Sequence, residues 1–137
     1  MSYIVRDGSS RRLIWGADGS GRHRAKEYFD GLGVRDRAKF EPAFSAMAET
    51  GKITNREKFN FEGDGLYCFK IHKHRLACFF ESRDVVIISG FEKKDDRSRK
   101  HSRQLDIAKE LRDDYLQRTK SEQTDDGPEE ARGGGRL

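Results

Sequence analysis

The stretch that decides the fold runs from Gly65 to Lys94 and reads GLYCFKIHKHRLACFFESRDVVIISGFEKK. Aromatic and β-branched residues favour strands, and short polar turns separate three runs of them. We therefore predict strands over residues 60–71, 75–80 and 85–91. The third run is apolar at consecutive positions, which is typical of a central strand covered on both faces.

The register of the first hairpin follows from its apolar pattern. Alternate positions are bulky and apolar on both arms: Tyr67, Phe69 and Ile71 on the first, and Leu76, Cys78 and Phe80 on the second. Directly opposed residues project to the same face, so matching these sets pairs Ile71 with His74 and Lys70 with Arg75. His72-Lys73 is then the turn. A slip of one residue would send Lys70 and Arg75 to opposite faces, and burial of the aromatic residues opposes it.

The predicted register places two cations side by side. Like charges directly opposite each other destabilise a sheet by roughly 0.2–1 kcal/mol. Retaining such a pair suggests a role in holding an anion, and the phosphates of a nucleic acid suit a small basic sheet. The same register sends Cys68 and Cys78 to opposite faces, so we expect free thiols. No paired Cys or His spacing indicates a zinc site, and no cofactor is expected.

The flanking segments predict one α+β domain over residues 1–120. A first strand is expected in 3–5, in 13–15 or in both, followed by a helix over 22–32 with apolar residues at helical spacing. A second helix should begin near Asp36 and end at Gly51, with Pro42 causing a kink or a later start. A last helix is expected over 102–118. Residues 121–137 lack periodicity and are rich in Gly, Glu and Asp, which predicts a disordered tail.

Charge and hydropathy narrow the classes of function. The 137 residues carry a net charge of +4. The tail has five acidic and two basic residues, so residues 1–120 alone carry +7. A compact basic domain is typical of proteins that bind nucleic acid or an acidic protein. No apolar run is long enough to span a membrane and no signal peptide opens the chain, so we expect a cytoplasmic protein without membrane contact.

The order of these elements resembles that of RelE/HigB-like toxins of bacterial type II toxin–antitoxin systems, specifically the phage-derived branch of the RelE/ParE superfamily. The resemblance covers roughly residues 22–115. Its matching segments are AKEYFDGL (25–32), DRAK (36–39), GLYCFK (65–70), Arg75, GFEKK (90–94) and IA (107–108).

The resemblance implies a small microbial ribonuclease fold, with two N-terminal helices packed on an antiparallel sheet and a C-terminal helix. It also implies metal-independent cleavage of mRNA on the ribosome and neutralisation by a cognate antitoxin. Carried over by position, Lys70, Arg75, Lys93 and Lys94 are the implied catalytic cations. The segment after the paired lysines departs from the family pattern, and Tyr115 suits the core, so His101 is the better candidate for the remaining catalytic group.

Further basic residues near the hairpin and after the last strand are candidates for attracting RNA phosphates: Lys73, His74, Arg97, Arg99 and Lys100. Each candidate also has a plain alternative, because surface lysines are common and histidines beside turns are often exposed without a role. Two other functions stay open at this point. One is a non-enzymatic ParE-like toxin that poisons gyrase, and the other is an RNA- or protein-binding module on the same scaffold.

Overall fold

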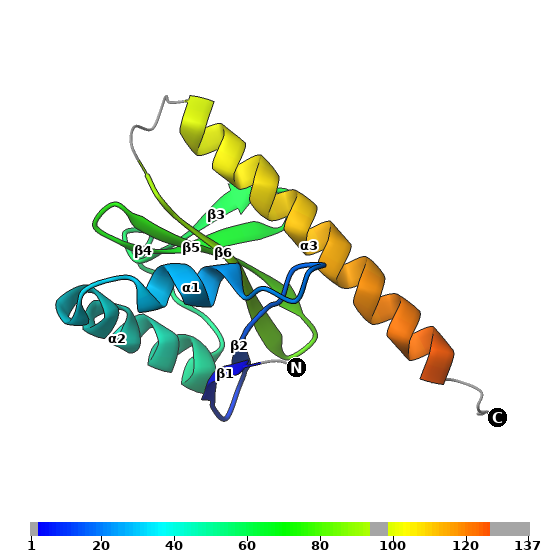
Figure 1. Cartoon of the computed structure of the whole chain (residues 1–137). Coiled ribbons are helices and arrows are strands. Elements are labelled where there is room, and N and C mark those ends of the chain that lie inside the picture. The colour runs from blue at the N-terminus through cyan, green and yellow to red at the C-terminus, as the bar shows by residue number, and fades with distance from the viewer. Residues whose placement is uncertain (1–2, 94–98, 127–137) are drawn as a thin grey trace.

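A computed structural model describes residues 3–93 and 99–126 of the chain, with side chains described for 3–93 and 102–120. The architecture is α+β, with a six-stranded mixed sheet and three helices in this part of the chain (Figure 1). The elements are β1 (Tyr3–Asp7), β2 (Arg12–Trp15), α1 (Arg24–Asp30), α2 (Val34–Thr50), β3 (Phe59–Gly63), β4 (Leu66–Ile71), β5 (His74–Glu81), β6 (Asp84–Glu92) and α3 (Arg99–Asp126).

The strand order is β1-β2-β6-β5-β4-β3. Two expectations are corrected here. The strands expected in 3–5 and 13–15 are both present, as β1 and β2, so the first two helices follow them instead of opening the chain as the resemblance implied. In addition β2 pairs with β6 in parallel, so the sheet is not antiparallel throughout. The physical reason is the apolar run in β2: Leu13 and Trp15 are buried on one face and Ile14 on the other, which suits an inner strand beside β6.

The segment predicted as one strand over 60–71 is a hairpin made of β3 and β4. Its turn is Asp64-Gly65, and both residues have positive φ, 53° and 75°. An Asp-Gly pair between strands is a strong hairpin signal because these residues tolerate that conformation. The turn at Asp64-Gly65 could therefore have been predicted from the sequence. It was overlooked because aromatic residues on both sides of it favour a continuous strand.

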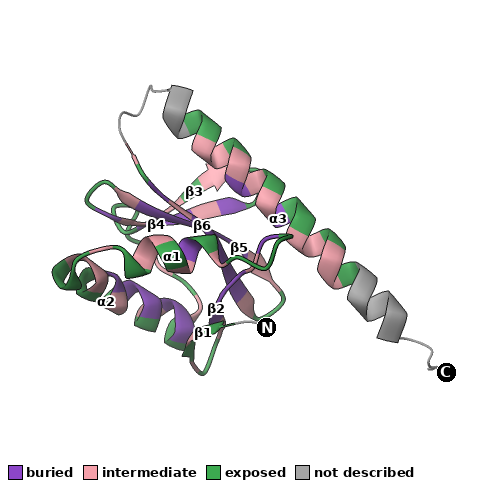
Figure 2. Ribbon diagram, viewed as in Figure 1, coloured by how far each residue is buried: buried purple, intermediate pink, exposed green. Residues whose placement is uncertain are grey.

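Each face of the sheet carries its own core. The face covered by α1 and α2 buries Val85 and Ile87 of β6, and the face covered by α3 buries Val86 and Ile88 (Figure 2). The prediction of a central strand is thus confirmed. Cys68 and Cys78 lie in different cores and are free, as the hairpin register predicted.

The helices differ from their predicted bounds. Helix α2 begins at Val34 and continues through Pro42, so the later start was wrong, and Gly33 instead of Asp36 is the N-cap residue. Helix α3 continues past Lys120 to Asp126, into the segment predicted to be disordered, while residues 127–137 lie outside the described part. None of the helices in the described ranges is long and apolar enough to cross a membrane.

Candidate functional site

The β4–β5 hairpin has the predicted register. Lys70 lies opposite Arg75 and Ile71 opposite His74, so His72-Lys73 is a two-residue turn. His72 has a φ of 53°, a left-handed conformation that is uncommon for residues other than glycine, although His, Asn and Asp adopt it more often than the rest. Burial of the aromatic set on the α2 side outweighs that local cost. The two cations therefore share the face that α3 covers.

Arg75 is the most unusual cation of the hairpin, because its side chain is only 6% exposed. Its Nη1 donates hydrogen bonds to the carbonyl oxygens of His72, at 2.8 Å, and His74, at 3.1 Å. Its Nε and Nη2 donate to no group in the described part of the chain, and no carboxylate there forms an ion pair with it. Burial lowers the pKa of Arg75, although a guanidinium stays charged at neutral pH.

The other buried charges contrast with Arg75. Asp18 is paired with Arg24 at 2.8 Å, and Arg112 is paired with Asp64 at 3.2 Å. A buried cation without an opposite charge is costly, since desolvation is not offset. Among the described residues, Arg75 is thus the buried charge whose electrostatics an added anion would improve.

Lys70 contributes a second, more accessible cation. It is half-buried, and its Nζ donates to the carbonyl oxygen of Arg56 at 3.0 Å, while its backbone N–H donates to that of Lys58 at 2.8 Å. An ammonium group has three donors, so the bond to Arg56 leaves two for another acceptor. The loop before β3 therefore holds Lys70 in position without neutralising it.

Two further lysines lie at the same end of the hairpin. Lys73 is exposed in the turn, and the backbone N–H of Lys93 donates to its carbonyl oxygen at 2.7 Å. This bond extends the β5–β6 pairing beyond Glu92 and brings the chain after β6 next to the turn. The structure therefore brings together Lys70, Lys73, Arg75 and Lys93 at one end of the sheet.

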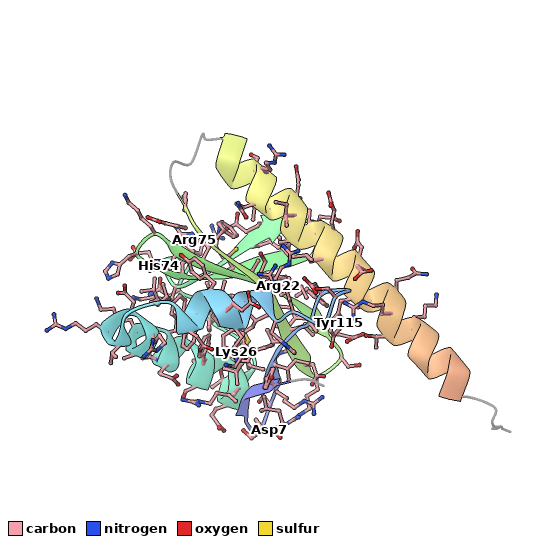
Figure 3. The ribbon with its side chains drawn as sticks, in the orientation of Figure 1. Asp7, Arg22, Lys26, His74, Arg75 and Tyr115 are labelled. Atoms are coloured by element: carbon pink, nitrogen blue, oxygen red, sulfur yellow. The ribbon has the colours of Figure 1, made fainter. Side chains whose placement is uncertain are left out.

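His74 lies on the opposite face from Arg75, although both belong to the same end of β5 (Figure 3). Its Nδ1 is 2.6 Å from the hydroxyl of Tyr28, and its Nε2 is 3.3 Å from Asp36. Burial and nearby Glu92 raise the pKa of Tyr28 to about 12. His74 therefore links α1, α2 and β5, and its alternating position on the strand separates it from the lysines.

The close packing of α1 explains how Tyr28 reaches His74. Gly90 of β6 lies beneath Tyr28, and a Cβ at this position would be 2.7 Å from the Cβ of the tyrosine. The absence of a side chain at Gly90 lets α1 approach the sheet closely. Gly90, the first residue of the segment GFEKK, therefore has a role in packing.

The remaining candidates from the sequence lie outside the part of the chain whose side chains the structure describes. Lys94 and Arg97 lie outside the described residues. Arg99, Lys100 and His101 are in the first turn of α3, and their side chains are not described. Arg112 of α3 attaches the helix to the β3–β4 turn. Its guanidinium donates hydrogen bonds to both the carbonyl oxygen and the carboxylate of Asp64.

Glu62 is a candidate that sequence reasoning missed. Its carboxylate acts electrostatically on Arg75 and on the thiol of Cys68, and the pKa of Cys68 is raised, first by burial and then by this charge. Glu62 comes from β3, directly before the Asp64-Gly65 turn. Recognising that turn would have identified a separate strand whose carboxylate acts on Arg75.

Comparisons with known proteins do not assign the chain to a family. No known protein family matches the chain, and no curated protein matches it either. Among the described residues, no cluster of three or more His, Cys, Asp or Glu side chains is arranged to hold a metal ion.

Proposed function

We propose that this chain is the toxin of a type II toxin–antitoxin module, with a RelE-like fold, and that it cleaves mRNA on the ribosome. It acts in the cytoplasm, where its substrate is, and a cognate antitoxin neutralises it. One observation carries the proposal: Arg75 is a buried cation directly opposite Lys70 and has no ion-pair partner among the described residues. A phosphate supplies the missing opposite charge.

The proposed reaction needs no metal. Glu62 accepts the proton of the ribose 2′-hydroxyl as its oxygen bonds to phosphorus, and the bond from phosphorus to the 5′-oxygen breaks. Lys70 and Arg75 stabilise the negative charge that builds on the phosphorane oxygens. The leaving 5′-oxygen takes a proton from Lys93, Lys94 or His101. The products are a 2′,3′-cyclic phosphate and a 5′-hydroxyl end.

Other basic residues attract the RNA without taking part in the bond changes. Lys73 is exposed beside the cation pair, and Arg97, Arg99 and Lys100 follow β6 in the sequence. Contacts of this kind release counterions from the phosphates, so they make binding weaken as salt concentration rises. His74 is left out of this set because Tyr28 and Asp36 already engage it on the other face.

A protein that binds without catalysis, either a ParE-like toxin that poisons gyrase or a module that binds RNA or a protein, is the second candidate. Its specific support is that Nη1 of Arg75 bonds two carbonyl oxygens of the hairpin, which is also what a purely structural arginine does. Under this alternative the cations attract a nucleic acid or an acidic protein, and no phosphodiester bond is broken.

Expression in a bacterium separates these functions. We expect growth arrest with the wild-type chain, arrest with the control Lys26→Ala on α1, and normal growth with Lys70→Ala combined with Arg75→Ala. Arrest that persists in the double variant, with intact transcripts and altered DNA supercoiling, contradicts the nuclease and supports gyrase poisoning. Normal growth with the wild-type chain contradicts both toxins.

A further inference from the structure

A hollow of about 510 Å³ lies between the end of α2 and the edge strand β3, on the sheet face that α2 covers. Its size falls within the range of about 300–1,000 Å³ that is usual for ligand pockets. The hollow is separate from the Lys70–Arg75 pair, because those side chains project to the α3 face. Nothing in the proposed reaction uses it.

Aromatic rings form one wall of the hollow. Phe61 is 55% exposed, which is unusual for a large apolar side chain on a strand. Its ring centroid is 5.1 Å from that of Tyr67, which in turn is stacked on Phe59 at 5.3 Å with an interplanar angle of 7°. Phe80 closes the group, 5.0 Å from Tyr67. The neighbouring rings hold Tyr67 and Phe61 in place, so they present preformed flat surfaces.

The rim of the hollow is positively charged. Lys52 and Arg56 line it, and the guanidinium of Arg11 lies 4.5 Å from the centre of the Phe80 ring. None of the described residues that line the hollow is acidic. Aromatic surfaces beside cations are the combination that proteins use for single-stranded nucleic acid, where bases stack on rings and cations hold the backbone.

One contact joins the hollow to the cation pair. Arg56 lines the hollow, and its carbonyl oxygen accepts the hydrogen bond from Nζ of Lys70 at 3.0 Å. A strand whose phosphate lies at Lys70 therefore passes the residue that borders the hollow. The path runs over the edge of the sheet at β3, which has no further strand beside it in the described part of the chain.

We propose that this hollow binds an unstacked base of single-stranded RNA, with Phe61 and Tyr67 as the stacking surface and Lys52 and Arg56 as phosphate contacts. The proposal rests on the proposed function in taking the same RNA strand as the ligand. An acidic peptide added to the β3 edge is the competing occupant. The charge of the rim suits both, but the exposed ring of Phe61 favours a planar base.

Equilibrium binding to an RNA that cannot be cleaved tests the hollow directly. The probe is a fluorescent single-stranded octamer with 2′-O-methyl riboses, whose blocked 2′-oxygens prevent cleavage, and the readout is fluorescence anisotropy. Phe61→Leu keeps an apolar side chain but loses the flat ring, so we expect the Kd to rise about tenfold. Phe61→Tyr should bind as the wild type does. Arg56→Gln should reduce the slope of log Kd against log salt by about one.

The matched control is Tyr3→Leu, which removes an exposed aromatic ring at the opposite edge of the sheet and should leave the Kd unchanged. The proposal is overturned if Phe61→Leu binds like the wild type, if Tyr3→Leu weakens binding equally, or if the wild type does not bind the octamer. Loss of binding to a protein partner in Phe61→Leu, with RNA binding intact, assigns the hollow to that partner instead.

The same measurement distinguishes failure of the hollow from failure of the proposed nuclease. If the octamer binds and depends on Phe61 while expression leaves growth and transcripts unaffected, the hollow stands and the nuclease falls. If transcripts are cleaved but Phe61→Leu does not change binding, the nuclease stands and the hollow is not an RNA subsite.

Discussion

Lys70 and Arg75 are direct cross-strand partners, yet different segments of the chain hold their two charges. The ammonium of Lys70 bonds the carbonyl oxygen of Arg56, and the guanidinium of Arg75 bonds those of His72 and His74. Each cation is thus held by backbone carbonyl oxygens, and neither forms an ion pair with a carboxylate of the described residues, although the charge of Glu62 acts on Arg75 from a distance. The hairpin maintains two like charges side by side, at an energetic cost that a bound phosphate would offset.

Replacing Arg75 by Gln removes the charge and keeps a donor for the turn carbonyls. We expect RNA cleavage to fall about 10²–10³-fold, as for loss of one group that stabilises charge in a transition state. The free energy of unfolding should fall by only about 1 kcal/mol. Cleavage is measured with induced cells, and stability by urea unfolding of the purified protein.

Arg112→Gln is the matched control, because Arg112 is also a buried arginine but bonds Asp64 in the β3–β4 turn. It should lower stability by at least as much as Arg75→Gln and retain cleavage at temperatures where the variant is folded. Equal loss of cleavage in both variants would show that a buried arginine matters here only for folding.

Tyr28→Phe tests the polar link between α1 and β5. The substitution removes the hydroxyl that lies 2.6 Å from Nδ1 of His74, so the free energy of unfolding should fall by about 1 kcal/mol. Tyr67→Phe is the control, since the hydroxyl of Tyr67 has no partner in the described part of the chain. The link has no energetic importance if the two variants unfold at the same urea concentration.

Asp18 should make stability depend on acidity. Burial alone would raise its pKa, but hydrogen bonds from Arg24, Ser20 and Arg22 outweigh burial and hold the pKa well below its usual range. A lowered folded-state pKa contributes stability above the unfolded value of about 3.9, and this contribution is lost as the pH falls further. Urea unfolding should therefore show wild type more stable than Asp18→Asn by about 2 kcal/mol at pH 7.

That difference should shrink as the pH is lowered from about 4 to about 2. In this range the Asp18 carboxylate of the unfolded wild-type chain takes up a proton, which stabilises the unfolded state. A difference between wild type and Asp18→Asn that is constant from pH 7 to pH 2 contradicts the assigned hydrogen bonds.

The two cysteines should be unreactive in the folded protein. Both are fully buried, on opposite faces of the sheet, and burial raises the pKa of each thiol. Since the thiolate is the reactive species, labelling by a thiol reagent at pH 8 should be slow in buffer and fast in urea. Rapid labelling of either cysteine without denaturant means that the sheet is open at that point.

The hairpin could be predicted because a single constraint decides it. Burying the aromatic arms on one face leaves one register, and that register gives the Lys70–Arg75 pair and separates the two thiols. The parallel pairing of β2 with β6 had no comparable signal. The pairing depends on where β6 lies after two helices and three intervening strands, and the periodicity of a short apolar segment does not encode that position.

The site was only partly predictable for the same reason. Lys70, Arg75, Lys73 and Lys93 follow from one hairpin and the strand beside it. Glu62 required the Asp64-Gly65 turn to be recognised inside what looked like a single strand. The pairing of His74 with Tyr28 and Asp36 joins three elements distant in sequence, and the position of His74 beside a turn suggested a contact with RNA instead.

Whether the Lys70–Arg75 pair cleaves mRNA is decided by mapping transcript ends after brief induction of the wild-type chain and of Lys70→Ala combined with Arg75→Gln. We expect new ends within translated regions, carrying 2′,3′-cyclic phosphates and 5′-hydroxyls, in the wild type and not in the double variant. Wild-type transcripts without new ends, or ends that appear equally in the double variant, would contradict the proposed cleavage.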